Sequence, residues 1–85
     1  MLKIGGDHTQ AGTGKVVQYT VEYDLDGNTG HWRGSILLRG GKRHMLAGGV
    51  LANVTRDTIG HAVMAARDVE IDGLDLEALN QAHGN

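Results

Sequence analysis

The strict alternation of apolar and polar side chains between Lys15 and Leu25 constrains the fold more than any other feature of this sequence. In KVVQYTVEYDL every second residue from Val17 onward is apolar, and the residues between them are polar. A period of two places one set of side chains on a buried face and the other set in water. The valines and tyrosines also favour a pleated surface. The sequence therefore predicts a half-buried strand over residues 15–25.

A second strand is expected directly after the turn sequence DGNTG, over residues 29–38. A two-residue turn at Gly27-Asn28 gives a register in which Tyr23 faces Trp32 on the apolar side of the hairpin. In the same register Glu22 faces Arg33 on the polar side. A four-residue loop would keep the same parity, which leaves the register incompletely fixed. A slip by one residue would put the aromatic side chains on the polar side and is disfavoured.

The sequence RHMLAGGVLANV, residues 43–54, predicts a third strand that follows the turn sequence RGGKR. Its apolar and polar residues alternate poorly, and the Gly48-Gly49 pair favours a bulge or a close approach of two backbones. The polar side of the sheet would also carry Leu37 and either Met45 or Leu46. This apolar patch would be covered by the C-terminal segment or by a second copy of the chain, so a homodimer is one expectation.

Thr55 is expected to cap a helix over residues 56–68. Apolar residues at i, i+3, i+4 and i+7 spacing would form the stripe that faces the sheet. The members of this stripe are Ile59, Ala62, Val63, Ala66 and Val69. The small alanines would let the helix lie close to the sheet.

The C-terminal part predicts two small elements. Residues 69–71 are expected to form a short strand, with a turn at Asp72-Gly73. Asp75 would then cap a short helix, with Leu76 and Leu79 facing inward.

Together these elements predict an α+β fold, a three- to four-stranded antiparallel sheet with one main helix packed on one face. The order is β-β-β-α, followed by the further short strand and the short helix. A chain of 85 residues suits a single domain. We expect a flexible glycine-rich lead-in over residues 1–14, in which residues 1–4 are a candidate for a short strand. The α+β domain is expected over residues 15–72, and a short C-terminal helix with a frayed tail over residues 73–85.

The composition excludes several classes of protein. Cysteine is absent, which excludes disulfides, cysteine-based zinc sites and thiol nucleophiles. No apolar run approaches the ~18–20 residues of a membrane span, and the N-terminus lacks the apolar core of a secretory signal. The expectation is a small soluble bacterial protein in the cytoplasm, without membrane association.

The sequence QAGTGKVV, residues 10–17, contains a Gly-Lys pair like that of a phosphate-binding loop. The leading glycine of that motif is replaced by Thr9, and Val16 stands where a hydroxyl side chain would bind magnesium. A strand is also predicted where the motif needs a helix N-terminus. The pair therefore indicates a glycine-rich lead-in that ends at a strand, and no nucleotide site.

Basic residues gather around the RGGKR turn, with no acidic residue between His31 and His44. They would project from one hairpin tip, which could engage a partner through its charge and a nearby tryptophan. The alternative is that the tip is charged only for solubility and that Arg33 simply pairs with Glu22. The candidate binding residues are Trp32, Arg33, Arg39, Lys42, Arg43 and His44.

The functional expectation is a non-catalytic protein-binding module, because a small sheet with exposed edges and apolar residues suits a protein partner. The alternative is a nucleic-acid-binding module that uses the hairpin tip 39–43, although the net charge of -2 gives no general attraction to nucleic acid.

No catalytic residue, metal or cofactor is expected. Ser35, the only serine, lacks an elbow motif, and the five histidines are not closely paired. An enzyme would be supported by histidine and acidic side chains that converge in one pocket.

The segments QYTVEYDLDG and NVTRDTIGHAVMAARDV resemble the N-terminal domain of HicB-type antitoxins, over about residues 16–71. In that family a Thr-x-x-Asp-Thr-like turn introduces the helix, which carries an Ala-x-x-x-Ala stripe. The matching residues are Thr55, Asp57, Thr58, Ala62, Ala66 and Val69. The resemblance implies a β-β-β-α-β fold similar to part of ribonuclease H. It also implies that the protein binds and neutralises a small ribonuclease toxin.

Overall fold

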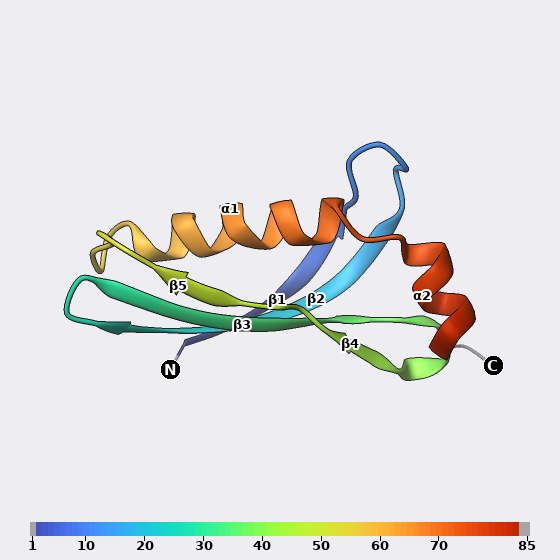
Figure 1. Cartoon of the computed structure of the whole chain (residues 1–85), viewed down its shortest axis with the longest axis horizontal. Coiled ribbons are helices and arrows are strands. Elements are labelled where there is room, and N and C mark those ends of the chain that lie inside the picture. Colours follow the sequence, from blue (N-terminus) through green and yellow to red (C-terminus); the bar gives the residue numbers. More distant parts are fainter. Residues whose placement is uncertain (1, 84–85) are drawn as a thin grey trace.

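A five-stranded antiparallel sheet with one long helix along a single face forms the fold, as the computed structural model shows (Figure 1). The structure describes residues 2–83, with side chains described as far as Gln81. Along the chain the elements are β1 (Leu2–Thr9), β2 (Val16–Asp26), β3 (Thr29–Leu37), the 3-10 turn η1 (Arg39–Gly41), β4 (Arg43–Met45), β5 (Gly49–Leu51), α1 (Ile59–Asp72) and α2 (Leu76–His83). The expected α+β class is confirmed.

β2 and β3 form the predicted hairpin in the predicted register. Tyr23 lies opposite Trp32, and Glu22 lies opposite Arg33. The pairing continues to the residues on either side of Gly27-Asn28, so the strands are joined by a two-residue turn. The apolar set of β2 is buried or half-buried, as the period of two predicts.

β1 replaces the first part of the irregular lead-in that was expected over residues 1–14. It pairs with β2 over its whole length, from Leu2 opposite Tyr23 to Thr9 opposite Val16. The expectation of a flexible lead-in is therefore wrong for residues 5–9, and, from Leu2 onward, the short strand considered for residues 1–4 is part of a longer one. The physical reason is that glycines carry no side chain to show a period of two, while the edge of β2 offers β1 a full row of backbone partners.

The turn after β1 is fastened to the end of α1, beside which it lies in Figure 1. Gln10 is 2% exposed, and its side-chain amide group donates hydrogen bonds to the carbonyl oxygens of Ile71 and Leu74, both at 2.7 Å. Its side-chain oxygen accepts a hydrogen bond from the Thr13 hydroxyl at 2.6 Å. The Ile71 carbonyl also accepts the Leu74 N–H at 3.1 Å, so Gln10 adds a second donor there and joins the turn to the end of the helix.

The strand expected over residues 43–54 is present as two short strands on the same edge of β3. β4 places Met45 opposite Ser35, and β5 places Gly49 opposite Trp32. Residues 46–48 interrupt the pairing between them, close to the predicted glycine pair.

Glu70 of α1 holds this interruption in place. Its carboxylate accepts hydrogen bonds from the backbone N–H groups of Ala47 at 2.7 Å and Gly48 at 3.1 Å. Gly48 has a φ of +70°, and a Cβ atom there would lie 2.5 Å from the carbonyl oxygen of Trp32. The two backbones therefore approach so closely that only glycine fits.

α1 begins later than the sequence predicts, because a separate turn precedes it. The N–H groups of Thr58 and Ile59 both donate to the Thr55 carbonyl, at 3.1 and 2.8 Å. The Thr58 hydroxyl in turn accepts a hydrogen bond from the Thr55 N–H at 2.8 Å. Thr58, and not Thr55, is therefore the last residue before the helix.

α1 also ends later than expected, so the short strand predicted at residues 69–71 is wrong. These residues stay helical, and the Gly73 N–H donates to the Val69 carbonyl at 3.2 Å where the helix ends. Val69 was expected in the stripe that faces the sheet, which is wrong, since its side chain is 74% exposed, whereas Ile71 is fully buried. The apolar stripe thus continues through Ile71, because the position eight residues after Val63 returns to the same side of a helix.

α2 is the predicted short helix. The Asp75 carboxylate accepts a hydrogen bond from the Ala78 N–H at 3.1 Å, which confirms Asp75 as its cap. Leu76 is 3% exposed, and Leu79 packs against the core.

Of the expected frayed tail, residues 84–85 lie outside the described residues. Neither described helix is long and apolar enough to cross a membrane.

The core lies between α1 and one face of the sheet, and Leu76 of α2 extends it at one end. Its fully or nearly fully buried apolar members are Val17, Tyr19, Val21, Tyr23, Trp32, Ile36, Leu38, Leu46, Val54, Ile59, Val63, Ile71 and Leu76. Arg67 of α1 places its guanidinium 4.3 Å from the centre of the Tyr19 ring, a cation–π contact. Most apolar side chains of the sheet are thus buried on the face that α1 covers, and most polar side chains lie on the opposite face.

Candidate functional site

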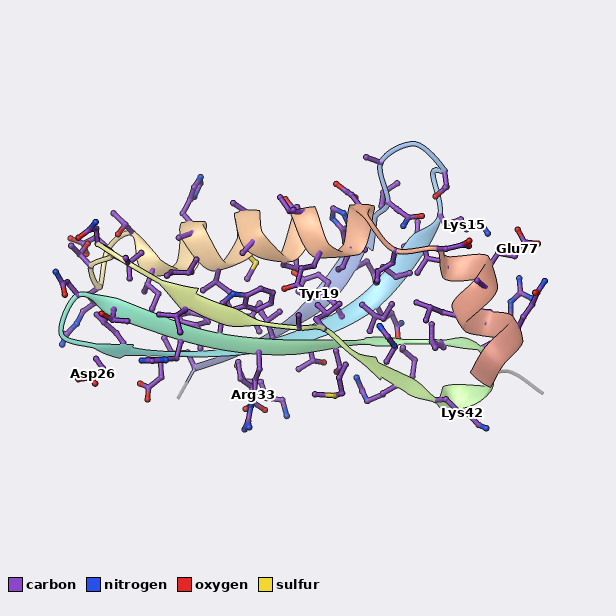
Figure 2. The ribbon with its side chains drawn as sticks, in the orientation of Figure 1. Lys15, Tyr19, Asp26, Arg33, Lys42 and Glu77 are labelled. Carbon is purple, nitrogen blue, oxygen red and sulfur yellow. The ribbon has the colours of Figure 1, made fainter. Side chains whose placement is uncertain are left out.

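The face of the sheet that points away from α1 forms a broad polar surface, because α1 lies on the opposite side and α2 lies at one end (Figure 1). Figure 2 shows Arg33 pointing away from α1, whereas Tyr19 lies between the sheet and the helix. We call this surface the open face. Its members include Lys3, Gly5 and Asp7 of β1, Val16, Gln18, Thr20, Glu22 and Asp24 of β2, His31, Arg33, Ser35 and Leu37 of β3, Arg43 and Met45 of β4, and Val50 of β5.

A shallow hollow of about 250 Å³ lies in the open face, and we call it the basic hollow. Three cationic side chains surround it, those of Lys3, Arg33 and Arg43, and the Glu22 carboxylate lies among them. The remaining lining residues are Thr20, Gly34, Ser35 and Met45. Three cations against one carboxylate leave an excess of two positive charges, so the basic hollow attracts anions.

Glu22 is held chiefly by Arg33, as the hairpin register predicts. Nε and Nη2 of Arg33 donate to one carboxylate oxygen at 3.2 and 2.9 Å, and Lys3 Nζ lies 4.0 Å from the other. The hydrogen bond from Arg33 is the main cause that holds the pKa of Glu22 below its ordinary value, against the opposing effect of burial. The charges of Arg33 and Lys3 lower this pKa further. Glu22 therefore stays ionised and keeps Arg33 in one orientation.

Arg43 reaches the basic hollow from β4. Its Nη1 donates to the Ser35 hydroxyl oxygen at 3.3 Å, which directs the guanidinium along the open face. Met45 beside it is 63% exposed, whereas Leu46 is 6% exposed. Met45, and not Leu46, is therefore the residue of this pair that lies on the open face, beside other apolar residues there such as Leu37 and Val50.

Two of the six candidate binding residues, Arg33 and Arg43, meet in the basic hollow. Lys3 joins them, although the sequence did not indicate it as a site residue. The signal that could have revealed Lys3 is its place opposite Glu22 once residues 2–9 are read as a strand. The hollow thus combines cations from three different strands.

The other four candidates lie elsewhere. Trp32 is 7% exposed in the core, so the exposed aromatic side chain expected beside the basic tip is not there. His44 is half-buried and lies opposite Ile36, on the α1 side of the sheet. Arg39 and Lys42 are exposed at the η1 turn. Arg39 and Lys42 thus form a positively charged turn at the end of the sheet and do not line the basic hollow.

A histidine and two aspartates converge on the α1 side of the sheet. His8 Nε2 lies 2.9 Å from Asp72 Oδ1, and His8 Nδ1 lies 3.3 Å from Asp68 Oδ1. Asp72 Oδ1 also accepts the Ala11 N–H at 2.9 Å. Ser35 lies on the open face and cannot share a site with His8. Among the described residues no group of three or more histidine or acidic side chains is arranged to hold a metal ion. The cluster joins β1 and its turn to α1.

Asp72 is expected to make the stability of the protein depend on pH in the acid range. The Ala11 hydrogen bond, followed by that of His8, holds its pKa below the ordinary value in the folded state. A lowered carboxyl pKa gives stability that is present above about pH 4 and is lost as the pH falls through the folded-state pKa. The unfolding midpoint in urea of Asp72→Asn should therefore fall less steeply below pH 4 than that of the wild type.

The matched control for this measurement is Asp57→Asn, which removes an exposed carboxylate before α1. Its pH profile should run parallel to that of the wild type. Parallel profiles for Asp72→Asn and the wild type would show that Asp72 does not couple folding to pH.

Comparison of the chain with protein-family models, with curated proteins and with solved structures gave no match.

Proposed function

We propose that this protein is a non-catalytic protein-binding module whose open face binds an acidic side chain of a partner protein. The observation that carries this proposal is the basic hollow, which is lined by the three cations Lys3, Arg33 and Arg43 and by the single carboxylate of Glu22. An arginine that is already oriented loses less conformational freedom when it binds a carboxylate. Arginine is also prominent among the residues that dominate interface energies. An aspartate or glutamate of the partner would reduce the excess positive charge of the hollow.

The wider open face favours a protein partner over a phosphate backbone. Asp7 and Asp24 lie on the same face as the cations, on neighbouring strands. A nucleic acid laid across this face would meet these carboxylates, whereas a protein surface can match both signs of charge. Met45, which is 63% exposed, adds an apolar contact of a kind that is enriched in protein interfaces.

The resemblance to HicB-type antitoxins supplies a partner class for this proposal. A small ribonuclease toxin is the first partner to test, and an acidic side chain of that toxin is the group expected to enter the basic hollow. The same test applies to any protein that the chain captures from its native source.

Arg43→Glu is expected to weaken partner binding about tenfold or more, because it turns an attraction for a carboxylate into a repulsion. The partner would be captured from the native source on the immobilised wild-type protein and identified. Its dissociation constant for each variant would then be measured by calorimetry.

Lys15→Glu is the matched control, since it makes the same change of charge on an exposed side chain beside the β1–β2 turn, away from Arg33 and the open face (Figure 2). This control should bind like the wild type. An equal loss in both variants would indicate a general charge effect. Unchanged binding of Arg43→Glu would show that the partner does not use the basic hollow.

The alternative function is nucleic-acid binding through the hairpin tip. It is favoured by Arg39 and Lys42, which are exposed at η1, next to Arg43 at the start of β4. Titration with RNA and DNA at two salt concentrations tests it, because phosphate contacts make affinity fall steeply with salt. Binding that weakens with salt and with Lys42→Glu would support this alternative, and no binding at low salt would exclude it.

A further inference from the structure

The outer edge of β1 is available for pairing with another strand. In the described part of the chain β1 is the last strand on its side of the sheet and pairs with β2 alone. It is eight residues long, and most of its residues are exposed, including Leu2 at 61%. Such an edge presents a row of backbone N–H and C=O groups without partners, which is the usual template for the addition of a strand.

The charged residues of β1 are arranged symmetrically about Gly5. Lys3 precedes Gly5 by two positions and Asp7 follows it by two, so both lie on the open face. If a second β1 pairs in the antiparallel direction with the two-fold axis at Gly5, each Lys3 lies opposite the partner's Asp7. This contact occurs twice, because a two-fold interface repeats every contact.

The same register also suits the other residues of the strand. Ile4 would lie opposite the partner's Gly6, which adds no side chain of its own between the two strands, and the two Gly5 residues at the axis carry none either. A two-fold axis at Gly6 would instead place Lys3 opposite the partner's Thr9 and leave Asp7 opposite a glycine. Only the axis at Gly5 joins opposite charges, so charge complementarity selects one register.

An edge strand that is protected against self-association commonly carries a charge that a second copy would repel or an interruption that breaks pairing. β1 has charges that attract a second copy, and it has no bulge in its pairing with β2. The opposite edge of the sheet differs, since β4 and β5 are three residues each and are separated by the interruption at residues 46–48. The favourable edge for pairing is therefore that of β1.

We propose that a second copy of this chain binds along β1, with the two strands antiparallel and the axis at Gly5. The two five-stranded sheets then form one continuous sheet, and both basic hollows lie on the same face. This inference goes beyond the proposed function and does not depend on it. Asp7 does not line the basic hollow, so a change at Asp7 tests the dimer separately from partner binding.

The test is a charge exchange measured by sedimentation equilibrium. The wild type is expected to be a dimer, and Asp7→Lys and Lys3→Asp should each raise the dimer dissociation constant about tenfold or more, because like charges then face each other twice. The double variant with both changes should restore the wild-type constant, since the attraction returns with its direction reversed.

Asp26→Lys is the matched control, because it makes the same change of charge at the far end of the β2–β3 hairpin (Figure 2). It should leave the dimer unchanged, and circular dichroism should show all variants folded. A monomeric wild type at high protein concentration would overturn the proposal. It would equally be overturned by single variants that dimerise like the wild type, or by a double variant that remains as weak as the single ones.

Discussion

Gly48→Ala is expected to lower the free energy of unfolding by about 3 kcal/mol or more. Alanine at a positive φ is strained, and the φ of Gly48 is +70°. In addition, the new Cβ would lie 2.5 Å from the carbonyl oxygen of Trp32 and 3.1 Å from the Cα of Arg33. Both are backbone atoms, so the clash can be relieved only by moving β3 away from the interruption that Glu70 holds.

Gly40→Ala separates the two causes of this loss. Its φ of +77° imposes a similar strain, but no atom lies within 4 Å of the added Cβ. It should therefore cost only about 1–2 kcal/mol. Urea unfolding of both variants measures the difference, and equal losses would show that the close approach at Gly48 costs nothing beyond its backbone angle.

Gln10→Ala is expected to lower the free energy of unfolding by about 2–4 kcal/mol. The substitution removes the hydrogen-bond donor for the carbonyls of Ile71 and Leu74 and the acceptor for the Thr13 hydroxyl. Gln10 is 2% exposed, so water cannot easily replace its side chain. Beyond the loss of stability, the β1–β2 turn should separate from α1, and its backbone amides should exchange faster with solvent.

Gln18→Ala is the matched control, because it truncates the same type of side chain at an exposed position of the open face. It should change the free energy of unfolding by less than about 0.5 kcal/mol. Similar losses in both variants, or unchanged amide exchange in the turn of Gln10→Ala, would contradict the role assigned to Gln10.

The central hairpin was predictable because two independent patterns agree on it. The alternation in β2 selects the buried face, and the pairing of Glu22 with Arg33 selects the register. A shift by one residue would lose both at once. The sequence left open only the length of the loop, because a four-residue loop keeps the same parity as the two-residue turn that is present.

β1 was not predictable from its own residues. Gly6 lies on the face of the sheet that α1 covers, and Gly5 lies on the open face. Neither glycine has a side chain that could show an alternation of apolar and polar residues. The strand forms because β2 offers its edge and because Gln10 fastens the following turn to α1. Both causes depend on residues outside 2–9. The pattern of residues within that segment therefore cannot predict the strand.

The boundaries of α1 were missed for a related reason. The β-branched residues Val69 and Ile71 favour a strand locally, but burial of Ile71 under the sheet keeps the segment helical. Glu70, which looks like a solvated acid in the sequence, binds two backbone N–H groups of a distant bulge. Tertiary contacts overrode local preference at each of these positions.

The candidate site was predicted in part. Arg33 and Arg43 were recognised by the absence of acids around them, and they meet in the basic hollow. Lys3 was missed together with β1. Trp32 was placed on the apolar side of the hairpin correctly, but that side is covered by α1, so the tryptophan stabilises the core and is not available to a ligand.

The contact between Gln10 and α1 also has a consequence for the order in which the chain can fold during synthesis. Gln10 leaves the ribosome before its partners Ile71 and Leu74, which follow 61 and 64 residues later. The β1–β2 hairpin must therefore wait, with its turn unfastened, until residues 71–74 have emerged. Contacts that span so much sequence slow folding. The exposed edge of the nascent β1 is then at its most vulnerable to pairing with other chains.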